Sequence, residues 1–179
     1  MMNIKFKRIR PENYDFILSL NEQNIEVLSP IFKGELCFFE RTADFFELVC
    51  IDGLPVGFCI ALREDIKEYD LRCYRWFRER YPKYLYIDRI VVSEKYRRLG
   101  IGKRIYNIIF NQAWKNGVKF VAAGITTAPY NESSLKFHQA LGFSEVGEET
   151  IRNGTVKVSM QIAEVGEEAF TQKDIDKNE

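Results

Sequence analysis

The stretch from Ile90 to Lys103 reads IVVSEKYRRLGIGK, and it decides the fold of this chain. Its first three residues end an apolar run that begins at Tyr84 and predicts a buried strand. After its two glycines, apolar residues recur on one face of a helix as far as Asn116-Gly117, a common C-terminal signal. The sequence thus predicts a strand, a glycine loop and a helix in direct succession.

A glycine loop in this position favours phosphate binding. Its backbone N–H groups can approach a phosphate closely, and the helix N-terminus adds a partial positive charge. The basic side chains around Gly100 and Gly102 are Arg97, Arg98, Lys103 and Arg104, and such a cluster can pair with a diphosphate. A plain connection between strand and helix, without a ligand, is the alternative that this pattern leaves open.

Two other phosphate-binding loops are excluded by spacing. A dinucleotide fingerprint needs a third glycine where this chain has Ile105. A P-loop needs Ser or Thr after Gly102-Lys103, and this chain has Arg104 there.

With its flanking strand and helix, Arg97-x-x-Gly100-x-Gly102 resembles the acyl-CoA pyrophosphate loop of the GNAT superfamily of N-acyltransferases. A second block, Asn131–Phe143, reads NESSLKFHQALGF. It resembles the family segment in which Asn begins a helix beside the pantetheine arm and Gly-Phe closes it. The resemblance covers about residues 84–146, whereas the N-terminal half matches only in the order of its elements.

The resemblance implies an α/β fold with a mixed, mostly antiparallel twisted central sheet, splayed at the acyl-CoA cleft, and helices on both faces. It also implies that acetyl-CoA is the acyl donor. The residues that it assigns to acyl-CoA binding are Ile90, Val91, Val92, Arg97, Arg98, Leu99, Gly100, Ile101, Gly102, Lys103 and Asn131.

The pattern along the rest of the chain is compatible with that fold. The strands predicted from alternation and turn residues are 3–9, 46–51, 56–61, 84–92, 118–125, 144–150 and 155–162, with Asp52-Gly53 as a hairpin turn. Helical patterns follow Pro11 and Asn131, and residues 29–44 show no clear pattern. We expect one domain over residues 1–163 and a mobile acidic tail over residues 164–179.

The composition favours a cytoplasmic globular protein. The chain has 179 residues, of which 46% are hydrophobic, with 26 Lys and Arg against 26 Asp and Glu. Zero net charge argues against a nucleic-acid partner. Neither a membrane span nor a signal peptide is evident. The cysteines show no metal-ligand spacing, so we expect no metal site; they are Cys37, Cys50, Cys59 and Cys73.

Acyl transfer to an amine requires a neutral amine, a polarised thioester carbonyl and a proton for the departing thiolate. The resemblance places the polarising N–H at or beside Val92. Asp88 is the one carboxylate in the apolar strand, where several branches of the family carry a base or a water-holding residue. The alternative is that Asp88 only pairs with Arg89 or a neighbouring strand. Tyr86 lies on the same strand face as Asp88, and its hydroxyl is a candidate to bind the amine.

His138 is the only histidine of the chain. It occupies the position at which many family members have the tyrosine that protonates the thiolate. Its imidazolium is a candidate general acid, and a purely structural hydrogen bond is the alternative. Tyr130, just before the capping Asn131, is a second phenol for the same role.

Residues 63–83 form a longer connection than the family usually has at this place. Apolar and aromatic residues recur there at helical spacing, which predicts a helix with an aromatic face. That face either closes over the acceptor, or covers the sheet edge, or forms a homodimer contact. The interleaved arginines also allow RNA binding, against which the zero net charge argues.

The function that follows is transfer of an acetyl group from acetyl-CoA to a primary amine of a small molecule, by direct attack in a ternary complex. No cysteine has a recognisable nucleophile setting, which disfavours an acyl-enzyme. Two alternatives stay open, a non-catalytic acyl-CoA-binding or interaction module and a protein or peptide N-acetyltransferase.

Overall fold

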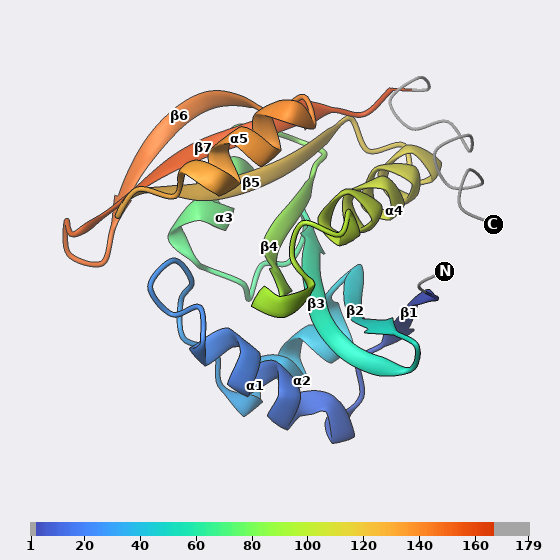
Figure 1. Ribbon diagram of the computed structural model, residues 1–179. Coiled ribbons are helices and arrows are strands. Elements are labelled where there is room, and N and C mark those ends of the chain that lie inside the picture. The colour runs from blue at the N-terminus through green and yellow to red at the C-terminus, as the bar shows by residue number, and fades with distance from the viewer. Residues whose placement is uncertain (1–2, 167–179) are drawn as a thin grey trace.

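Seven strands form one sheet in the structure, a computed structural model that describes residues 3–166 (Figure 1). The strands are β1 (Ile4–Arg8), β2 (Phe45–Ile51), β3 (Leu54–Arg63), β4 (Leu85–Val92), β5 (Phe120–Ala128), β6 (Ser144–Ile151) and β7 (Val156–Glu164). Their order is β1-β2-β3-β4-β5-β7-β6. Neighbours are antiparallel except β4 and β5, which are parallel. The expected mixed, mostly antiparallel sheet is confirmed.

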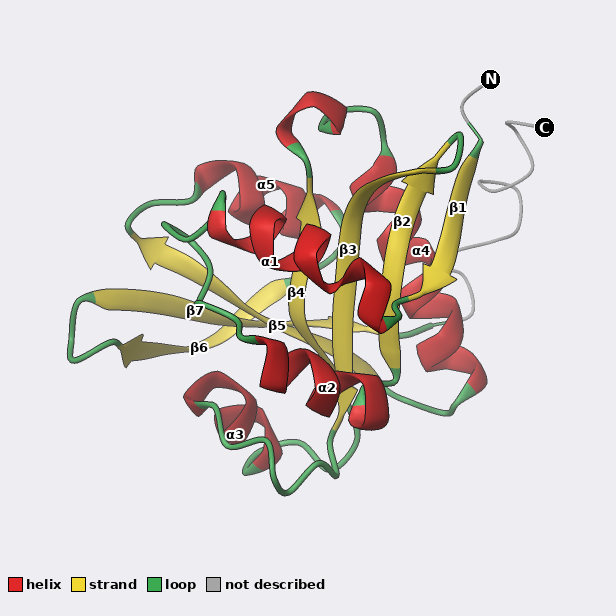
Figure 2. Ribbon diagram, turned by 90° about the horizontal axis from the view of Figure 1, so that it is seen from below, coloured by secondary structure: helices red, strands yellow, loops and turns green. Residues whose placement is uncertain are grey.

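Helices cover both faces of this sheet (Figure 2). The helices are η1 (Pro11–Asn13), α1 (Tyr14–Glu22), α2 (Lys33–Thr42), α3 (Arg72–Arg78), η2 (Glu94–Tyr96), α4 (Ile101–Lys115) and α5 (Glu132–Ala140). One core cluster joins α1, α2 and α3 to the sheet, and a second joins α4 and α5 to the opposite face.

The apolar spacing of each helix explains which face it buries. Ile101, Ile105 and Ile109 of α4 lie on one stripe and are at most 2% exposed, as a period of 3.6 residues requires. Ile17 and Leu20 of α1 are buried in the same way on the other side of the sheet. Each such side chain contributes about 1.5–3 kcal/mol through burial, so both helical layers are fixed by the sheet.

The parallel pair β4–β5 is short. It is formed only by Leu85, Tyr86 and Ile87 opposite residues 121–123. Beyond these residues β4 pairs only with β3, and β5 only with β7. The two strands therefore diverge toward their carboxyl ends, which confirms the expected splay and opens a wedge in the sheet.

A β-bulge lies at Asp88, where the wedge begins. Ala61 of β3 pairs with Ile87 and Ile60 pairs with Arg89, so Asp88 is the extra residue of β4. The bulge interrupts the alternation of side chains. Asp88 and Arg89 consequently both face the layer of α1 and α3, where sequence alternation alone would separate them.

The segment 63–83 differs from its prediction. β3 continues to Arg63, and the helix α3 covers only 72–78 instead of the whole segment. Its aromatic side chains are core residues, because Tyr74 and Phe77 are fully buried. Trp76 packs against Gly147 of β6, where an added Cβ would lie 2.5 Å from its ring. Of the alternatives for this segment, covering the sheet is the one that these contacts fit.

Other boundaries lie close to expectation. The helix predicted after Pro11 is η1 and α1, and the unassigned residues 29–44 contain α2. The last strand ends at Glu164, and most of the expected acidic tail lies outside the described residues. Within residues 3–166, the structure has no helix with the length and hydropathy that a bilayer crossing needs.

Candidate active site

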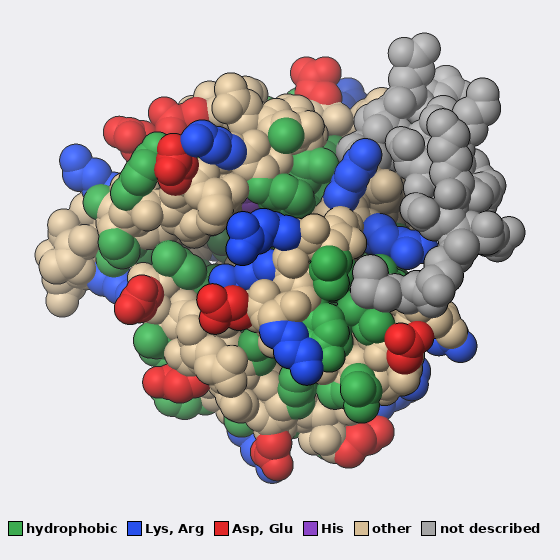
Figure 3. All heavy atoms as spheres, in the orientation of Figure 1, with side chains coloured by type: hydrophobic (Ala, Val, Ile, Leu, Met, Phe, Trp, Pro, Cys, Tyr) green, Lys and Arg blue, Asp and Glu red, His purple; other side chains and the backbone are tan. Residues whose placement is uncertain are grey.

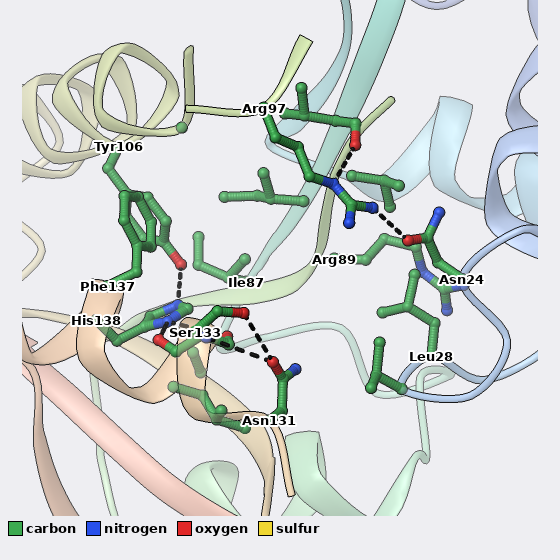
Figure 4. A pocket seen from close by; sticks show the side chains of 18 of the residues that line it. Asn24, Leu28, Ile87, Arg89, Arg97, Tyr106, Asn131, Ser133, Phe137 and His138 are labelled. Carbon is green, nitrogen blue, oxygen red and sulfur yellow. Dashed lines mark hydrogen bonds between the residues drawn. The ribbon is translucent and has the colours of Figure 1, made fainter. Parts of the chain in front are cut away.

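A cavity of about 590 Å³ occupies the wedge between β4 and β5. Its walls come from β4, the loop before α4, the first turns of α4, β5, α5 and the segment after α1 (Figure 4). It brings together most of the residues predicted from sequence, namely Asp88, Ile90, Val91, Val92, Arg97, Arg98, Gly100, Ile101, Gly102, Lys103, Asn131 and His138. The two sequence blocks thus meet in one place.

Three of the predicted residues do not line this cavity. Tyr86 is buried on the α3 side of the sheet beside Tyr74 and Phe77, and burial raises its pKa well above the usual value. Leu99 and Tyr130 point to the surface, where they are 44% and 71% exposed. Their assigned roles therefore receive no support from this geometry.

The loop before α4 has the conformation that its glycines allow. Gly100 has φ +78°, a left-handed value that side chains rarely adopt. A Cβ at Gly102 would lie 3.0 Å from the ring of Phe137 on α5, so the helix approaches its neighbour closely there. Residues 100–103 line the cavity, and the backbone N–H groups of a first helical turn have no partner within the helix, as an anion site requires.

Basic side chains surround this end of the cavity. Arg97, Arg98 and Lys103 all line it, and Figure 3 shows Lys and Arg side chains gathered where the face is hollowed. Arg97 also joins two walls, since its Nε donates to the Val92 carbonyl (3.0 Å) and its Nη2 to Asn24 Oδ1 (2.6 Å). The arrangement fits a ligand that carries several phosphates, because cations and helix N–H groups converge on one end.

Asp88 and Arg89 form a buried ion pair at the floor of the cavity. Arg89 Nε lies 2.7 Å from Asp88 Oδ2, and both side chains are 3% exposed. The other Asp88 oxygen accepts a hydrogen bond from the Tyr69 hydroxyl. Although burial opposes the charged guanidinium, the Asp88 carboxylate raises the pKa of Arg89. Pairing with Arg89, the structural alternative for Asp88, is therefore present, and both of its oxygens are occupied.

Arg89 extends this network to the segment after α1. Its Nη1 donates to Asn21 Oδ1 (2.8 Å) and to the Ser29 carbonyl (3.1 Å). Asn21 Nδ2 donates to the same carbonyl (3.0 Å). The buried charges thus hold the segment that forms one cavity wall.

His138 is 9% exposed and has a partner for each ring nitrogen. Its Nδ1 lies 2.7 Å from the Ser134 carbonyl, which can only accept, so Nδ1 carries the proton. Nε2 lies 2.5 Å from the Tyr106 hydroxyl (Figure 4). Burial lowers the pKa of His138 below its usual 6.5. The neutral ring therefore accepts a hydrogen bond from Tyr106 and offers no proton to the cavity.

The sequence interpretation missed several lining residues. Tyr106 lies one helical turn after Gly102 on the buried face of α4, and this spacing was a usable signal. Asn24 and Leu28 follow α1 in a segment without a regular pattern, so nothing in the sequence indicated that they form a wall.

The architecture and the cavity agree with what a comparison of this chain with known protein families and solved structures finds. Residues 14–143 match the model of the acetyltransferase (GNAT) family. The chain belongs to this family. As a GNAT protein, it is an acetyl-CoA-dependent N-acetyltransferase, and the loop before α4 fits the phosphates of that donor. A search of curated proteins finds no match.

Solved structures share this GNAT fold. Ard1 from Thermoplasma volcanium has a TM-score of 0.73 at 14% identity and covers 92% of this chain and 99% of its own. Naa50 from Arabidopsis thaliana, in complex with the bisubstrate analogue CoA-Ac-MVNAL, has a TM-score of 0.67 at 16% identity. The match covers 89% of this chain and 97% of that protein. IAA acetyltransferase from Bacillus cereus ATCC 14579 has a TM-score of 0.61 at 18% identity, and the match covers 90% of this chain and 99% of that protein. These similarities concern the fold, and their named acceptors differ.

Proposed function

We propose that this acetyltransferase acetylates a primary amine of a small molecule, by direct attack in a ternary complex with acetyl-CoA. The observation that carries the proposal is a bridge between the strands β5–β7 and the segment after α1, on the side of the cavity that we assign to the acceptor. Arg152, in the turn between β6 and β7, donates from Nη2 to the Leu28 carbonyl at 2.6 Å. Thr126 of β5 reaches the neighbouring Val27 carbonyl at 3.4 Å. An extended peptide needs an open groove here, and the bridge favours a smaller acceptor.

The charges of the cavity narrow the acceptor class. Among the described lining residues, Asp88 is the one carboxylate, and Arg89 neutralises it. A second ammonium group on the acceptor would therefore find no free negative partner, and its desolvation would cost free energy. This supports acceptors with a single amine over polyamines.

Direct attack is supported by the cysteines. All four lie within residues 3–166, and none of them lines the cavity. Burial raises the pKa of Cys73, which packs near Gly124 of β5, to about 12. A thiolate nucleophile is thus disfavoured, and the amine itself is left to attack the thioester.

Calorimetric titration with acetyl-CoA, followed by a thiol-release screen, tests the proposal. We expect acetyl-CoA binding and turnover on monoamines or amino acids, with much slower turnover on polyamines and peptides. Preferred turnover on peptides would replace the small-molecule acceptor by a protein one. Binding without turnover on any of these amine classes would contradict the proposed small-molecule acceptor.

The variant Arg152→Ala makes the test specific to the bridge. We expect it to raise KM for the amine and leave the acetyl-CoA dissociation constant unchanged. Arg72→Ala is the matched control, because Arg72 pairs at 2.6 Å with Glu149 of β6, which does not line the cavity, whereas Leu28, the partner of Arg152, does. Equal effects of the two substitutions would contradict the acceptor assignment.

A further inference from the structure

A phenol and an imidazole from different helices meet inside the cavity. Tyr106 comes from α4 and His138 from α5, and both side chains line the space where β4 and β5 diverge. The Tyr106 ring contacts the rings of Phe137, His138 and Phe143 edge-on, which fixes its plane. Its hydroxyl is thereby held at the cavity wall beside Nε2 of His138.

The proton of this pair belongs to Tyr106. The Ser134 carbonyl keeps the His138 proton on Nδ1, so Nε2 is an acceptor in the neutral ring. The Tyr106 hydroxyl donates to it, and burial raises the pKa of Tyr106, so the phenol remains protonated. At neutral pH the single N–H of the imidazole is thus held by the Ser134 carbonyl, whereas the phenol has an O–H that can rotate toward the cavity.

Other hydroxyl groups on the cavity wall are less suited to the same task. They belong to Tyr96, Thr126, Ser133 and Ser134, each of which is partly or fully exposed. Tyr106 is 1% exposed. A hydrogen bond to a developing charge is strongest where water is excluded, and Tyr106 is the one buried hydroxyl of this described set.

We propose that the Tyr106 hydroxyl donates the hydrogen bond that stabilises the departing CoA thiolate, and that His138 is a positioning residue for Tyr106. The proposal rests on the acetyl transfer proposed above. In that step the amine nitrogen bonds to the acetyl carbon, and the C–S bond breaks with its electron pair on sulfur. Tyr106 turns its O–H from His138 Nε2 to this sulfur and keeps the proton. The amine nitrogen loses one proton as the amide forms, and the thiolate sulfur finally takes up that proton, so the products are the amide and the CoA thiol.

Tyr106→Phe tests the first half, because it removes only the hydroxyl. We expect kcat to fall about 10- to 100-fold, the worth of one hydrogen bond to a charged group, while the acetyl-CoA dissociation constant from calorimetry stays within about twofold. Tyr14→Phe is the matched control, since its buried hydroxyl donates to Glu40 and Tyr14 does not line the cavity. An unchanged kcat in Tyr106→Phe would overturn the proposal.

His138 variants separate positioning from acid catalysis. His138→Phe removes the acceptor for the Tyr106 proton, whereas the side-chain oxygen of His138→Gln can replace it. We expect kcat to fall in the first variant and to be partly restored in the second. In the double variant with Tyr106→Phe we expect no further loss than in Tyr106→Phe alone. If the fold-decreases in kcat of the two single variants multiply in the double variant, and Gln does not restore kcat, then His138 is an independent acid. That result would overturn the positioning role.

A readout without substrate completes the test. Because the chain has one histidine, nitrogen NMR of the free protein without an added tag reports one imidazole. We expect the neutral Nδ1–H form at pH 7, and a protonated ring there would contradict the assignment. Absence of acetyl-CoA binding in the unsubstituted protein would instead refute the proposed function, so the two failures are distinguishable.

Discussion

Removal of the Asp88 carboxylate is expected to destabilise the fold strongly. Its partner Arg89 is equally buried, with both side chains 3% exposed and 2.7 Å between Nε and Oδ2. In Asp88→Ala, the guanidinium keeps only the neutral acceptors Asn21 Oδ1 and the Ser29 carbonyl. A buried charge that loses its ionic partner costs about 3–5 kcal/mol, which is a large part of a typical stability of about 5–15 kcal/mol.

Urea unfolding, monitored by circular dichroism, measures this loss in the free energy of unfolding. Asp88→Leu combined with Arg89→Met removes both charges, and we expect it to recover at least about half of the loss, because apolar replacement of a buried pair is often neutral or stabilising. The exposed pair of Lys136 with Glu132 gives the control, since Lys136→Ala is expected to change the free energy of unfolding by less than about 0.5 kcal/mol. A loss below about 1 kcal/mol in Asp88→Ala, or a double variant no more stable than the single one, would refute the reasoning.

Three further substitutions test the loop, the imidazole and the segment before β4. Gly102→Val places atoms where even a Cβ would lie 3.0 Å from the Phe137 ring; calorimetry is expected to show acetyl-CoA affinity at least about tenfold lower, and unchanged affinity would contradict the loop assignment. Burial lowers the pKa of His138 below 6.5, so its contribution to stability is complete above that pH and is lost as the pH falls through the folded-state pKa. Unfolding free energies measured between pH 7 and pH 5 should therefore fall more steeply in the unsubstituted protein than in His138→Gln, and equal slopes would contradict the shift. Gly147→Ala brings a Cβ to 2.5 Å from Trp76 and is expected to cost about 1–3 kcal/mol in urea unfolding, whereas full stability would show that the contact relaxes freely.

The glycine loop was predictable because its determinants are local. The φ of Gly100 and the apolar stripe of α4 are fixed by residues within a few turns of each other. The hairpin at Asp52-Gly53 is predictable for the same reason, since both residues have positive φ. Alternation and turn residues are sufficient where neighbours along the chain decide the conformation.

The segment around α3 was not predictable, because distant contacts decide its shape. The Tyr69 side chain is held by Asp88 of β4 outside any helix, although its spacing from Cys73 and Trp76 suggests one. Asp70 lies just before α3, and its carboxylate accepts a hydrogen bond of 3.0 Å from Arg75 within that helix. Tertiary partners thus override a helical periodicity that is only apparent in the sequence.

The sequence was sufficient to predict the backbone elements of the candidate site, but not the protonation states of its side chains. The sequence placed His138 and the loop together, but the state of the imidazole depends on Tyr106, which is 32 residues away. The bulge at Asp88 is likewise a property of register, which no single strand encodes. Roles that depend on pairs of side chains need the assembled fold.

The early separation of β4 from β5 leaves two facing strand edges inside the protein. Beyond Ile87 and Ala123, the backbone N–H and C=O groups on these edges have no strand partner across the wedge. An extended molecule with amide groups of its own can complete both ladders, as an inserted strand does. Recognition of this kind depends on main-chain atoms, so it tolerates drift in the side chains around it. Structures only 14 to 18% identical to this chain share its fold, and recognition through main-chain atoms is compatible with sequence divergence of that size.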